Sequence, residues 1–600
     1  MSNPDSPNPL FNPAVLTRRV LFFVLLAGLA LLYLLVFFRG ISEPQGMDQA
    51  QIAREIARGN GPRTKVLRPV AIWQNQQASG GQATLEEASY DTYHAPLNPL
   101  FLAAVFKAVG AEESAAWRMA DSETVYKLDR VVAAASVICF LMAIGVNYLL
   151  IARLFDNKIA GVTALLMLLC DLNWRFSLSG LPQMLMLLLF SCAMFFAYRA
   201  VENSEEGGLT LVPALLAGLF LALLALAHWL AIWIILGYIV FASILIRPRG
   251  IAGVIAVVFV LLFAAYPVFK NAEYTGSPGG TALLALYNGL GGSEDFVMRS
   301  FDLGEASLPL QNLPQKIIRT MLSQGNSLYV QLGSIVVAPL FFISLLHPFK
   351  RRSIATFRWG ILLMWLTAVL GMSIYGLGTG GIHSNQLHIL FVPLMSAYGL
   401  AFITILWSRL RIATEVPQLR NAHFFVVVLI SAGPLLLSLP RDIRSGFSAE
   451  SMQPHWPPYF PSTLNTRLTE LTLPNEIVVS DQPWAVAWYA DRKSIWLPRK
   501  PEIFEMLEGM AEDQGTPVAG ILISPYSHSM QTMPNVFREY ADFIPLILDG
   551  WATASIRSPR AGILAEGQRD IKTILARYPH PAYFNGSLLM YWSSQPVYQE

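Results

Sequence analysis

The sequence predicts an α-helical membrane protein that crosses the bilayer many times, and three observations indicate this class. Of the 600 residues, 54% are hydrophobic. Only 14% are charged, whereas soluble domains carry about 25% charged residues. Apolar runs recur between residues 20 and 440, and several have the roughly 17 to 25 residues that cross a hydrocarbon core.

The charge and the cysteines exclude one class of partner and two kinds of site. The formal net charge is +2, and no basic run of the kind that binds nucleic acid is present, so no nucleic-acid partner is expected. Cys139, Cys170 and Cys192 all lie in apolar runs, where cysteine behaves as a small hydrophobic residue. We therefore expect neither a disulfide framework nor a zinc site.

The first apolar run orients the chain in the membrane. Residues 1–19 are polar and rich in proline, and no small-residue cleavage signal follows the run Val20–Phe38, so we interpret this run as an uncleaved anchor. Arg18 and Arg19 precede it, which places residues 1–19 in the cytoplasm. Residues 39–130, which we call the first loop, are then external.

The later apolar runs set the number of spans. The run Leu211–Ile246 is too long for one ordinary span and is either one overlong helix or two short helices that turn near His228 and Trp229. Only two helices leave the later short basic loops in the cytoplasm. We therefore expect about eleven spans in residues 20–440, with a second large external loop at 270–331. The other predicted spans are Val131–Ile151, Ile159–Leu172, Leu181–Tyr198, Ile251–Phe269, Gly333–Leu346, Trp359–Ile374, Leu387–Trp407 and Phe424–Leu439.

One apolar segment of the first loop is too short to be a span. It runs over Leu97–Val109, and Pro96 and Pro99 interrupt it. We interpret it as an interfacial or re-entrant helix. This interpretation determines on which side of the membrane every later loop lies.

Residues 441–600, which we call the tail, are less hydrophobic than the rest. EIVVSD and AGILISP have the composition of buried strands, whereas EIFEMLEGM has helical spacing of apolar residues. This alternation predicts a small α/β domain, which the topology places on the external, periplasmic side of the membrane.

Asp48 in the first loop is the strongest candidate for chemistry. It opens the helix-like segment DQAQIAREIARG, which Gly59 and Gly61 end. Asp48 can be the N-cap of that helix, with Gln51 completing a capping box. A carboxylate fixed at a helix start beside a membrane is also placed to act as a general base or a metal ligand, and the two interpretations are compatible.

The sequence also resembles the GT-C glycosyltransferases, membrane enzymes that include protein O-mannosyltransferases and the aminoarabinose transferase of lipid A. The resemblance rests on MDQAQIAREIARGNG, YHAPLNPLFLAAVFKAVG and KLDRVVAAASVICFLMAIGVNYLLIARLFDNKIAGVTALLML. It implies a GT-C-like fold, a sugar donor on polyprenyl phosphate, and Asp48 as the carboxylate that assists attack of the acceptor hydroxyl on the anomeric carbon. Family members often carry an acidic pair here, whereas Gln49 follows Asp48, so a divalent metal ion is an open alternative.

A polar cluster after a glycine-rich turn is the predicted site of the donor phosphate. It lies in GLGTGGIHSNQLHILFVPL and comprises His383, Asn385, Gln386 and His388. Polar groups where a turn enters a helix N-terminus suit an anion, and related enzymes often place an Arg or His there to meet the lipid phosphate. Ordinary loop polarity is the alternative.

Five further residues are possible donor or acceptor contacts, and each also has a structural interpretation. His94 lies where related enzymes have polar or charged residues, and interfacial packing explains it equally well. Asp171 and Arg175 lie at the outer end of a predicted span, where a local ion pair is the simpler explanation. Lys270 and Glu273 follow the predicted span that ends at residue 269, where a lysine commonly extends to the interface.

These features predict transfer of a sugar from a polyprenyl-phosphate donor to a lipid, polysaccharide or protein acceptor, at the external face of a bacterial inner membrane. A transporter or flippase for a lipid-linked glycan is one alternative, but such pathways usually need intramembrane charges and the predicted spans contain almost none. A catalytically silent protein that binds glycan or protein through its tail is the other.

The topology makes a prediction for Arg351, which it places on the cytoplasmic side. In a background without native cysteines, Arg351→Cys should escape a membrane-impermeant maleimide in spheroplasts, because the bilayer shields it. Arg63→Cys in the first loop is the control and should be labelled. Labelling of both positions at the same rate would overturn the topology.

Overall fold

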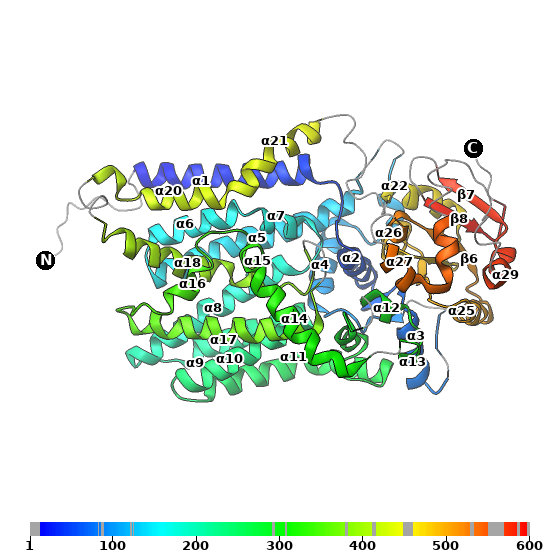
Figure 1. Cartoon of the computed structure of the whole chain (residues 1–600), viewed down its shortest axis with the longest axis horizontal. Coiled ribbons are helices and arrows are strands. Elements are labelled where there is room, and N and C mark those ends of the chain that lie inside the picture. The colour runs from blue at the N-terminus through cyan, green and yellow to red at the C-terminus, as the bar shows by residue number, and fades with distance from the viewer. Residues whose placement is uncertain are drawn as a thin grey trace.

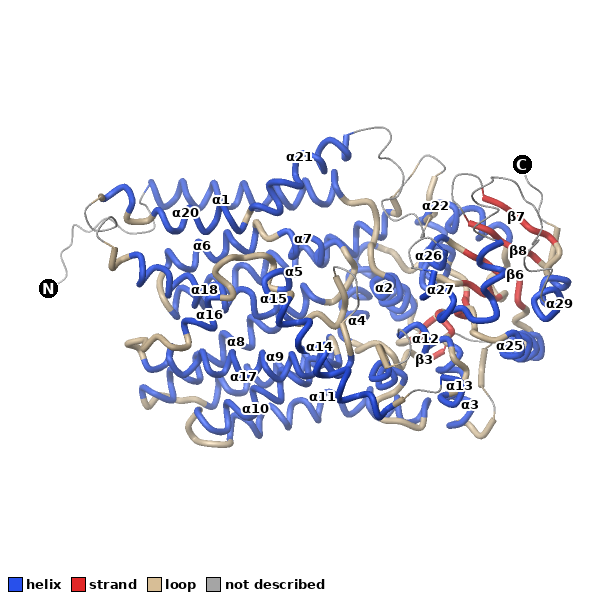
Figure 2. Tube along the Cα trace, in the orientation of Figure 1, coloured by secondary structure: helices blue, strands red, loops and turns tan. Residues whose placement is uncertain are grey.

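The computed structural model describes residues 13–596, except 82, 86–88, 121–122, 124, 291–293, 307–308, 378–381, 411–415, 448–459, 529–532, 550–568 and 585–588. It has two parts along its long axis, a bundle of long helices and a smaller head (Figure 1). Figure 2 shows that the strands are confined to the head. The predicted segment 1–19 and the beginning of the tail lie partly outside the described residues.

The bundle is built from the apolar runs of the sequence. Six described helices are long and apolar enough to cross a membrane, or up to eight if each of two bent pairs is one span. The chain is thus mostly helical, and this criterion gives fewer spans than the eleven predicted. The elements are α1 (Pro13–Leu31) with the π-helix η2 (Leu32–Phe37), α5 (Lys127–Leu154), α6 (Asn157–Leu168), α7 (Asp171–Leu178), α8 (Gln183–Glu206), α9 (Leu211–Ala227), α10 (Ile232–Leu245), α11 (Ile251–Thr275), α14 (Leu313–Asn326), α15 (Leu328–Gln331), α16 (Leu340–Ser344), α17 (Arg352–Tyr375), α18 (His388–Trp407), α20 (Ala422–Ser431) and α21 (Gly433–Phe447).

Short and bent helices account for the difference in count. The bent pairs are α6 with α7, at 54°, and α20 with α21, at 48°. The long run divides as predicted into α9 and α10, and at the break His228 Nδ1 accepts a hydrogen bond from Leu230 N at 3.2 Å. The predicted span Gly333–Leu346 forms only the short α16, because Pro339 has no N–H to carry a helix through this point.

The head contains a six-stranded mixed sheet in the order β2-β5-β4-β6-β8-β7. The first four of these strands run parallel, and the last two form an antiparallel hairpin that pairs with β6. The strands are β2 (Val66–Leu67), β5 (Lys493–Trp496), β4 (Ile477–Ser480), β6 (Val518–Ile523), β8 (Leu589–Ser593) and β7 (His580–Phe584), while β1 (Arg63–Thr64) and β3 (Ser89–Tyr90) form a separate pair. Because β2 belongs to the first loop, the tail does not form this sheet alone.

Helices from both the first loop and the tail surround the sheet. Short 3₁₀ turns join them. From the first loop come α2 (Pro44–Ala57), α3 (Pro69–Ala78) and α4 (Leu97–Val109), and the later elements are α12 (Glu294–Arg299), α13 (Leu303–Ala306), α22 (Pro461–Thr463), η9 (Leu464–Leu468), α23 (Thr469–Leu471), α24 (Pro483–Ala485), η10 (Val486–Ala490), α25 (Pro501–Asp513), α26 (Pro525–His528), α27 (Met533–Tyr540) and α29 (Arg569–Arg577). The helix predicted over Leu97–Val109 is α4, and it packs on α2.

Apolar residues of the strands alternate between the two faces of the sheet. In β4, Ile477 and Val479 belong to the same buried cluster as Phe504 of α25. Val478, which points the other way, belongs to a cluster with Met47 of α2. The sheet is therefore covered on both faces, and α2 is part of the core of the head.

Two glycines bring α2 against the bundle. A Cβ added to Gly46 would lie 2.5 Å from Ser179 O in the turn between α7 and α8. Gly180 has φ +80°, and its added Cβ would lie 2.9 Å from Ile41 Cγ2. A larger side chain at either glycine would push α2 away from the bundle.

Asp129 of α5 attaches the head to the bundle. Its buried carboxylate accepts hydrogen bonds from Trp488 Nε1 at 2.7 Å, from Tyr489 OH at 3.0 Å and from Ile41 N at 3.4 Å. Two donors belong to η10 of the tail, and the third precedes α2. One carboxylate of a bundle helix thus holds both the tail and the first loop.

Trp488→Phe tests this attachment, because it removes the indole N–H and keeps an aromatic ring. We expect the free energy of unfolding in detergent to fall by about 1 to 3 kcal/mol, since a buried carboxylate loses a donor. The control is Trp359→Phe, whose side chain is 47% exposed and should change stability little. Equal effects of the two substitutions would contradict the assigned role of Asp129.

Candidate functional site

The candidate site is built on α2, which begins earlier than the sequence predicts. Pro44 occupies the first helical position, where its fixed φ suits a helix start, and Glu43 is the N-cap. Asp48 therefore lies within the first turns of α2 and is not an N-cap, which corrects the predicted capping box. Instead, Gln51 Nε2 donates to Asp48 Oδ1 at 3.0 Å and holds its side chain.

Asp48 is the centre of a buried cluster of charges. The residue is 3% exposed, and its Oδ2 is hydrogen-bonded to Arg68 Nη2 and to His94 Nε2, the latter at 2.9 Å. Burial alone would raise the pKa of Asp48, but the Arg68 guanidinium and His94 outweigh burial and hold this pKa well below its usual range. Asp48 is therefore an ionised carboxylate near neutral pH.

Asp91 holds the backbone around His94. Its Oδ2 accepts a hydrogen bond from His94 N at 3.0 Å, and its Oδ1 accepts one from Tyr93 N at 3.3 Å. Burial raises the pKa of Asp91 to about 6, although the nearby His94 opposes the rise. The ring of Tyr93 packs on Arg68, whose guanidinium carbon lies 4.3 Å from the ring centre. The cluster is thus fixed on several sides.

An apolar cavity of about 310 Å³ adjoins the cluster. Side chains of α9, α10 and α11 form much of its wall, and Tyr93 and His94 line it on the side of the first loop. Asn385 and His228 also line it. His94 therefore connects Asp48 with a cavity whose wall comes from bundle helices.

A second cavity, of about 260 Å³, lies on the other side of Tyr93. We call it the tyrosine cavity, because Tyr90 and Tyr274 line it as a stacked pair with ring centroids 4.9 Å apart. Arg68 and Asp91 line it as well. Since Tyr93 lines both cavities, the charged cluster lies between them.

A third cavity has a volume of about 720 Å³. We call it the basic cavity, because several cationic side chains line it. Lys316 and Arg319 of α14 line it. Four of the residues predicted from the sequence line it too, namely Asp171, Arg175, His383 and Gln386. The side chains of Arg175, Lys316 and Arg319 thus line a space of the size that a phosphorylated ligand needs.

The structure divides the predicted phosphate cluster between two cavities. His383 and Gln386 line the basic cavity, whereas Asn385 lines the apolar cavity, so residues 382–387 separate them. Burial lowers the pKa of His383 to about 4, and its Nδ1 accepts a hydrogen bond from Asn385 N at 3.1 Å. His383 is therefore neutral and is not a cation for the phosphate.

His388 is turned into the protein. Its Nδ1 accepts a hydrogen bond from Trp365 Nε1 at 3.1 Å, and its Nε2 lies 3.0 Å from Gln324 Oε1. Both ring nitrogens are thus engaged in the bundle, and the residue is fully buried. This corrects the predicted phosphate contact, because His388 has no remaining donor to offer.

Lys270 and Glu273 are not brought to the site. Their side chains pair with each other on α11 at 2.7 Å, and both are partly exposed. Neither is among the residues that line the three cavities. The structure thus favours the interfacial interpretation of Lys270.

The donor set around Asp48 does not fit a divalent metal ion. Among the described residues, no group of three or more His, Cys, Asp and Glu side chains could hold one. The same Asp48 oxygen that would ligate a metal faces the guanidinium of Arg68, which would repel a second cation. Arg68 and His94 therefore bind the Asp48 carboxylate, which the sequence analysis had considered as a possible metal ligand.

Several site residues were not predicted. The DTYH segment carries a signal for Asp91, because an aspartate commonly accepts hydrogen bonds from the backbone two or three residues on. No local signal identifies Arg68, since its contact with Asp48 depends on the course of β2. Lys316 and Arg319 belong to α14, which lies in the predicted second external loop.

The raised pKa of Asp91 predicts how stability depends on pH. The folded protein keeps this proton up to about pH 6, whereas a free aspartate loses it near pH 3.9, so the folded state binds more protons between these values. Rising pH in this window therefore favours unfolding. From pH 4 to pH 7, Asp91→Asn should gain about 1 to 3 kcal/mol of unfolding free energy relative to wild type. Unfolding in detergent at both pH values measures this, and equal pH dependence of the two proteins would contradict it.

No protein-family model matches the chain, and no curated protein sequence matches it. Among solved structures, the chain is similar to apo ArnT from Cupriavidus metallidurans, with 12% identity and a TM-score of 0.49, over 86% of this chain and 94% of that chain. The same enzyme bound to undecaprenyl phosphate gives 13% identity and a TM-score of 0.47, over 85% and 94% of the two chains. The oligosaccharyltransferase of Archaeoglobus fulgidus in complex with Zn and sulfate gives 15% and 0.47, over 86% and 70%.

Proposed function

We propose that the chain transfers a sugar from a polyprenyl-phosphate-linked donor to an acceptor hydroxyl at the external face of the membrane. The observation that carries this proposal is the buried, ionised Asp48 paired with His94 at the wall of an apolar cavity. The sequence resemblance to the GT-C glycosyltransferases over the first loop supports the same reaction.

The two members of this pair have different tasks. Asp48 is a weak base, because its pKa is held far below its usual range. His94 is the better proton acceptor: with Nε2–H directed at Asp48 Oδ2, its ring keeps a lone pair on Nδ1. A carboxylate that orients an imidazole in this way is a common arrangement for a general base. The role predicted for Asp48 thus becomes orientation and charge balance of His94.

In the proposed step, the acceptor hydroxyl oxygen attacks the anomeric carbon of the donor. Its proton passes to Nδ1 of His94 as the new carbon–oxygen bond forms. The bond between the anomeric carbon and the phosphate oxygen breaks, and its electron pair leaves with the polyprenyl phosphate. Negative charge therefore grows on the phosphate, where cations lower the barrier.

The apolar cavity and the basic cavity fit the two ends of such a donor. A lipid that carries a phosphate needs an apolar wall and cations side by side. Residues 382–387 lie between the apolar cavity and the basic cavity, so both environments are adjacent. Arg175, Lys316 and Arg319 are the cations that we assign to the departing phosphate.

Asp48→Asn and His94→Gln should each reduce transfer by at least about a hundredfold, because His94→Gln removes the group that accepts the hydroxyl proton and Asp48→Asn removes the carboxylate that orients it. The measurement is label moved from a panel of radiolabelled polyprenyl-phosphate sugars, in membranes with matched protein levels. Glu470→Gln, which changes an exposed carboxylate of the tail, is the control and should keep the wild-type rate. Wild-type transfer by Asp48→Asn would refute the proposal, and movement of intact donor across vesicles without transfer would indicate a transporter.

The pH profile of the wild-type enzyme separates the two assignments of the base. A histidine base gives an acidic limb between about pH 5 and 8, the range in which imidazole changes its charge. If Asp48 itself took the proton, the limb would lie below pH 4, because the pKa of Asp48 is lowered. An acidic limb below pH 4 would therefore contradict the role given to His94.

A further inference from the structure

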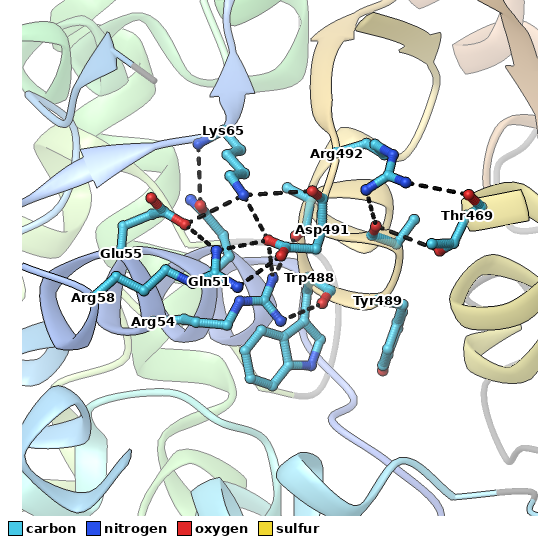
Figure 3. A network of polar contacts seen from close by, with 12 residues as sticks. Gln51, Arg54, Glu55, Arg58, Lys65, Thr469, Trp488, Tyr489, Asp491 and Arg492 are labelled. Carbon is cyan, nitrogen blue, oxygen red and sulfur yellow. Dashed lines mark hydrogen bonds and ion pairs between the residues drawn. The ribbon is translucent and has the colours of Figure 1, made fainter. Parts of the chain in front are cut away.

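A tail residue, Asp491, faces α2 from the turn that precedes β5 of the sheet. It lies between η10 and β5 with φ +56°, a left-handed conformation that turns the chain from one element into the other. Its carboxylate binds three cations of the first loop, as Figure 3 shows. The oxygen–nitrogen distances are 3.0 Å to Arg54, 2.7 Å to Arg58 and 2.6 Å to Lys65.

Arg54 fixes one end of this network inside the protein. Arg54 is fully buried, and it also donates to Trp488 O at 3.0 Å and to Ala487 O at 2.8 Å. Burial opposes ionisation of Asp491, but Arg54 and the other two cations hold its pKa well below its usual range. Without Asp491, Glu55 would be the carboxylate left beside Arg58 and Lys65, and the attachment of α2 to this turn would be weakened to the Arg54 hydrogen bonds with the backbone.

Gln51 connects the network with Asp48. Lys65 N donates to Gln51 Oε1 at 3.0 Å, while Lys65 O accepts a hydrogen bond from Ser494 N of β5 at 2.9 Å. With Oε1 facing Lys65 N, the amide of Gln51 directs Nε2 toward Asp48 Oδ1. If the amide rotated by half a turn, it would present an oxygen to the carboxylate and repel it.

We infer that Asp491 is a positioning residue for Asp48, acting through Lys65 and Gln51. This inference rests on the proposed function and extends it, because it makes the tail part of the apparatus that orients the reacting groups. Asp491 touches neither the apolar cavity nor the basic cavity. Its loss should therefore affect the chemical step more than the binding of the donor.

The test compares Asp491→Asn with a matched substitution in the same head. Glu508→Gln is the control, because Glu508 is likewise a carboxylate with little exposure that binds an arginine, Arg577, at 2.8 Å, but on the face of the sheet away from α2. In Asp491→Asn, kcat should fall about tenfold or more with the donor KM within about twofold, and Asp491→Glu should recover most of the loss. Glu508→Gln should leave both constants unchanged. An unchanged kcat in Asp491→Asn would overturn the inference.

Hydrogen exchange of the full-length protein tests the same inference without an activity assay. Amides of α2 should exchange faster in Asp491→Asn than in wild type or Glu508→Gln. If wild type transfers no sugar but α2 loosens as expected, the proposed function fails while the positioning of α2 stands. Unchanged exchange in α2 would overturn the positioning role, whatever the enzyme transfers.

If Asp491→Asn does not accumulate in membranes, Lys65→Met is a second variant that tests the same inference. It leaves Asp491 paired with Arg54 and Arg58 and removes the cation nearest to the Gln51 contact. We expect a smaller fall in kcat, about threefold, and recovery by Lys65→Arg. Equal kcat values for wild type and Lys65→Met would count against the inference.

Discussion

The structure depends on the attraction between one carboxylate, Asp491, and three cations of the first loop. Arg54 is fully buried, and a charge that has lost its solvation needs a partner. Arg54, Arg58 and Lys65 therefore bind α2 and the chain before β2 to a single turn of the tail. The helix that carries Asp48 is thereby built into the head, although its sequence lies next to the first candidate membrane span.

The position of α2 explains how one helix serves three purposes. One side contributes Met47 to the core under the sheet. Its N-terminal end passes so close to the bundle that position 46 must be glycine. Between these contacts, Asp48 faces Arg68 and His94. Each contact removes a way for α2 to rotate or slide, so Asp48 is held with little freedom, as the proposed reaction requires.

Local patterns in the sequence predicted part of this arrangement. Apolar length and two prolines indicated α4 with its correct bounds, and the length of the run after residue 210 indicated the break at His228. The helix α2 begins at Pro44, four residues before the predicted start, so the prediction of Asp48 as its N-cap was wrong. The contact between Asp48 and Arg68 was beyond prediction, because it requires β2 to join a sheet whose other strands lie after residue 470. His388 shows a further limit, since a sequence does not tell which way a ring faces.

The most direct test of this account is whether the first loop and the tail share one sheet. Val66 and Ser494 are register partners in β2 and β5, and Cα atoms of such partners lie about 5 Å apart, within reach of a disulfide. In a cysteine-free background, Val66→Cys with Ser494→Cys should therefore oxidise to an intramolecular disulfide, detected by mass spectrometry of linked peptides. Val66→Cys with Val478→Cys, one strand further away, should stay reduced. Free thiols in the first pair would contradict the account.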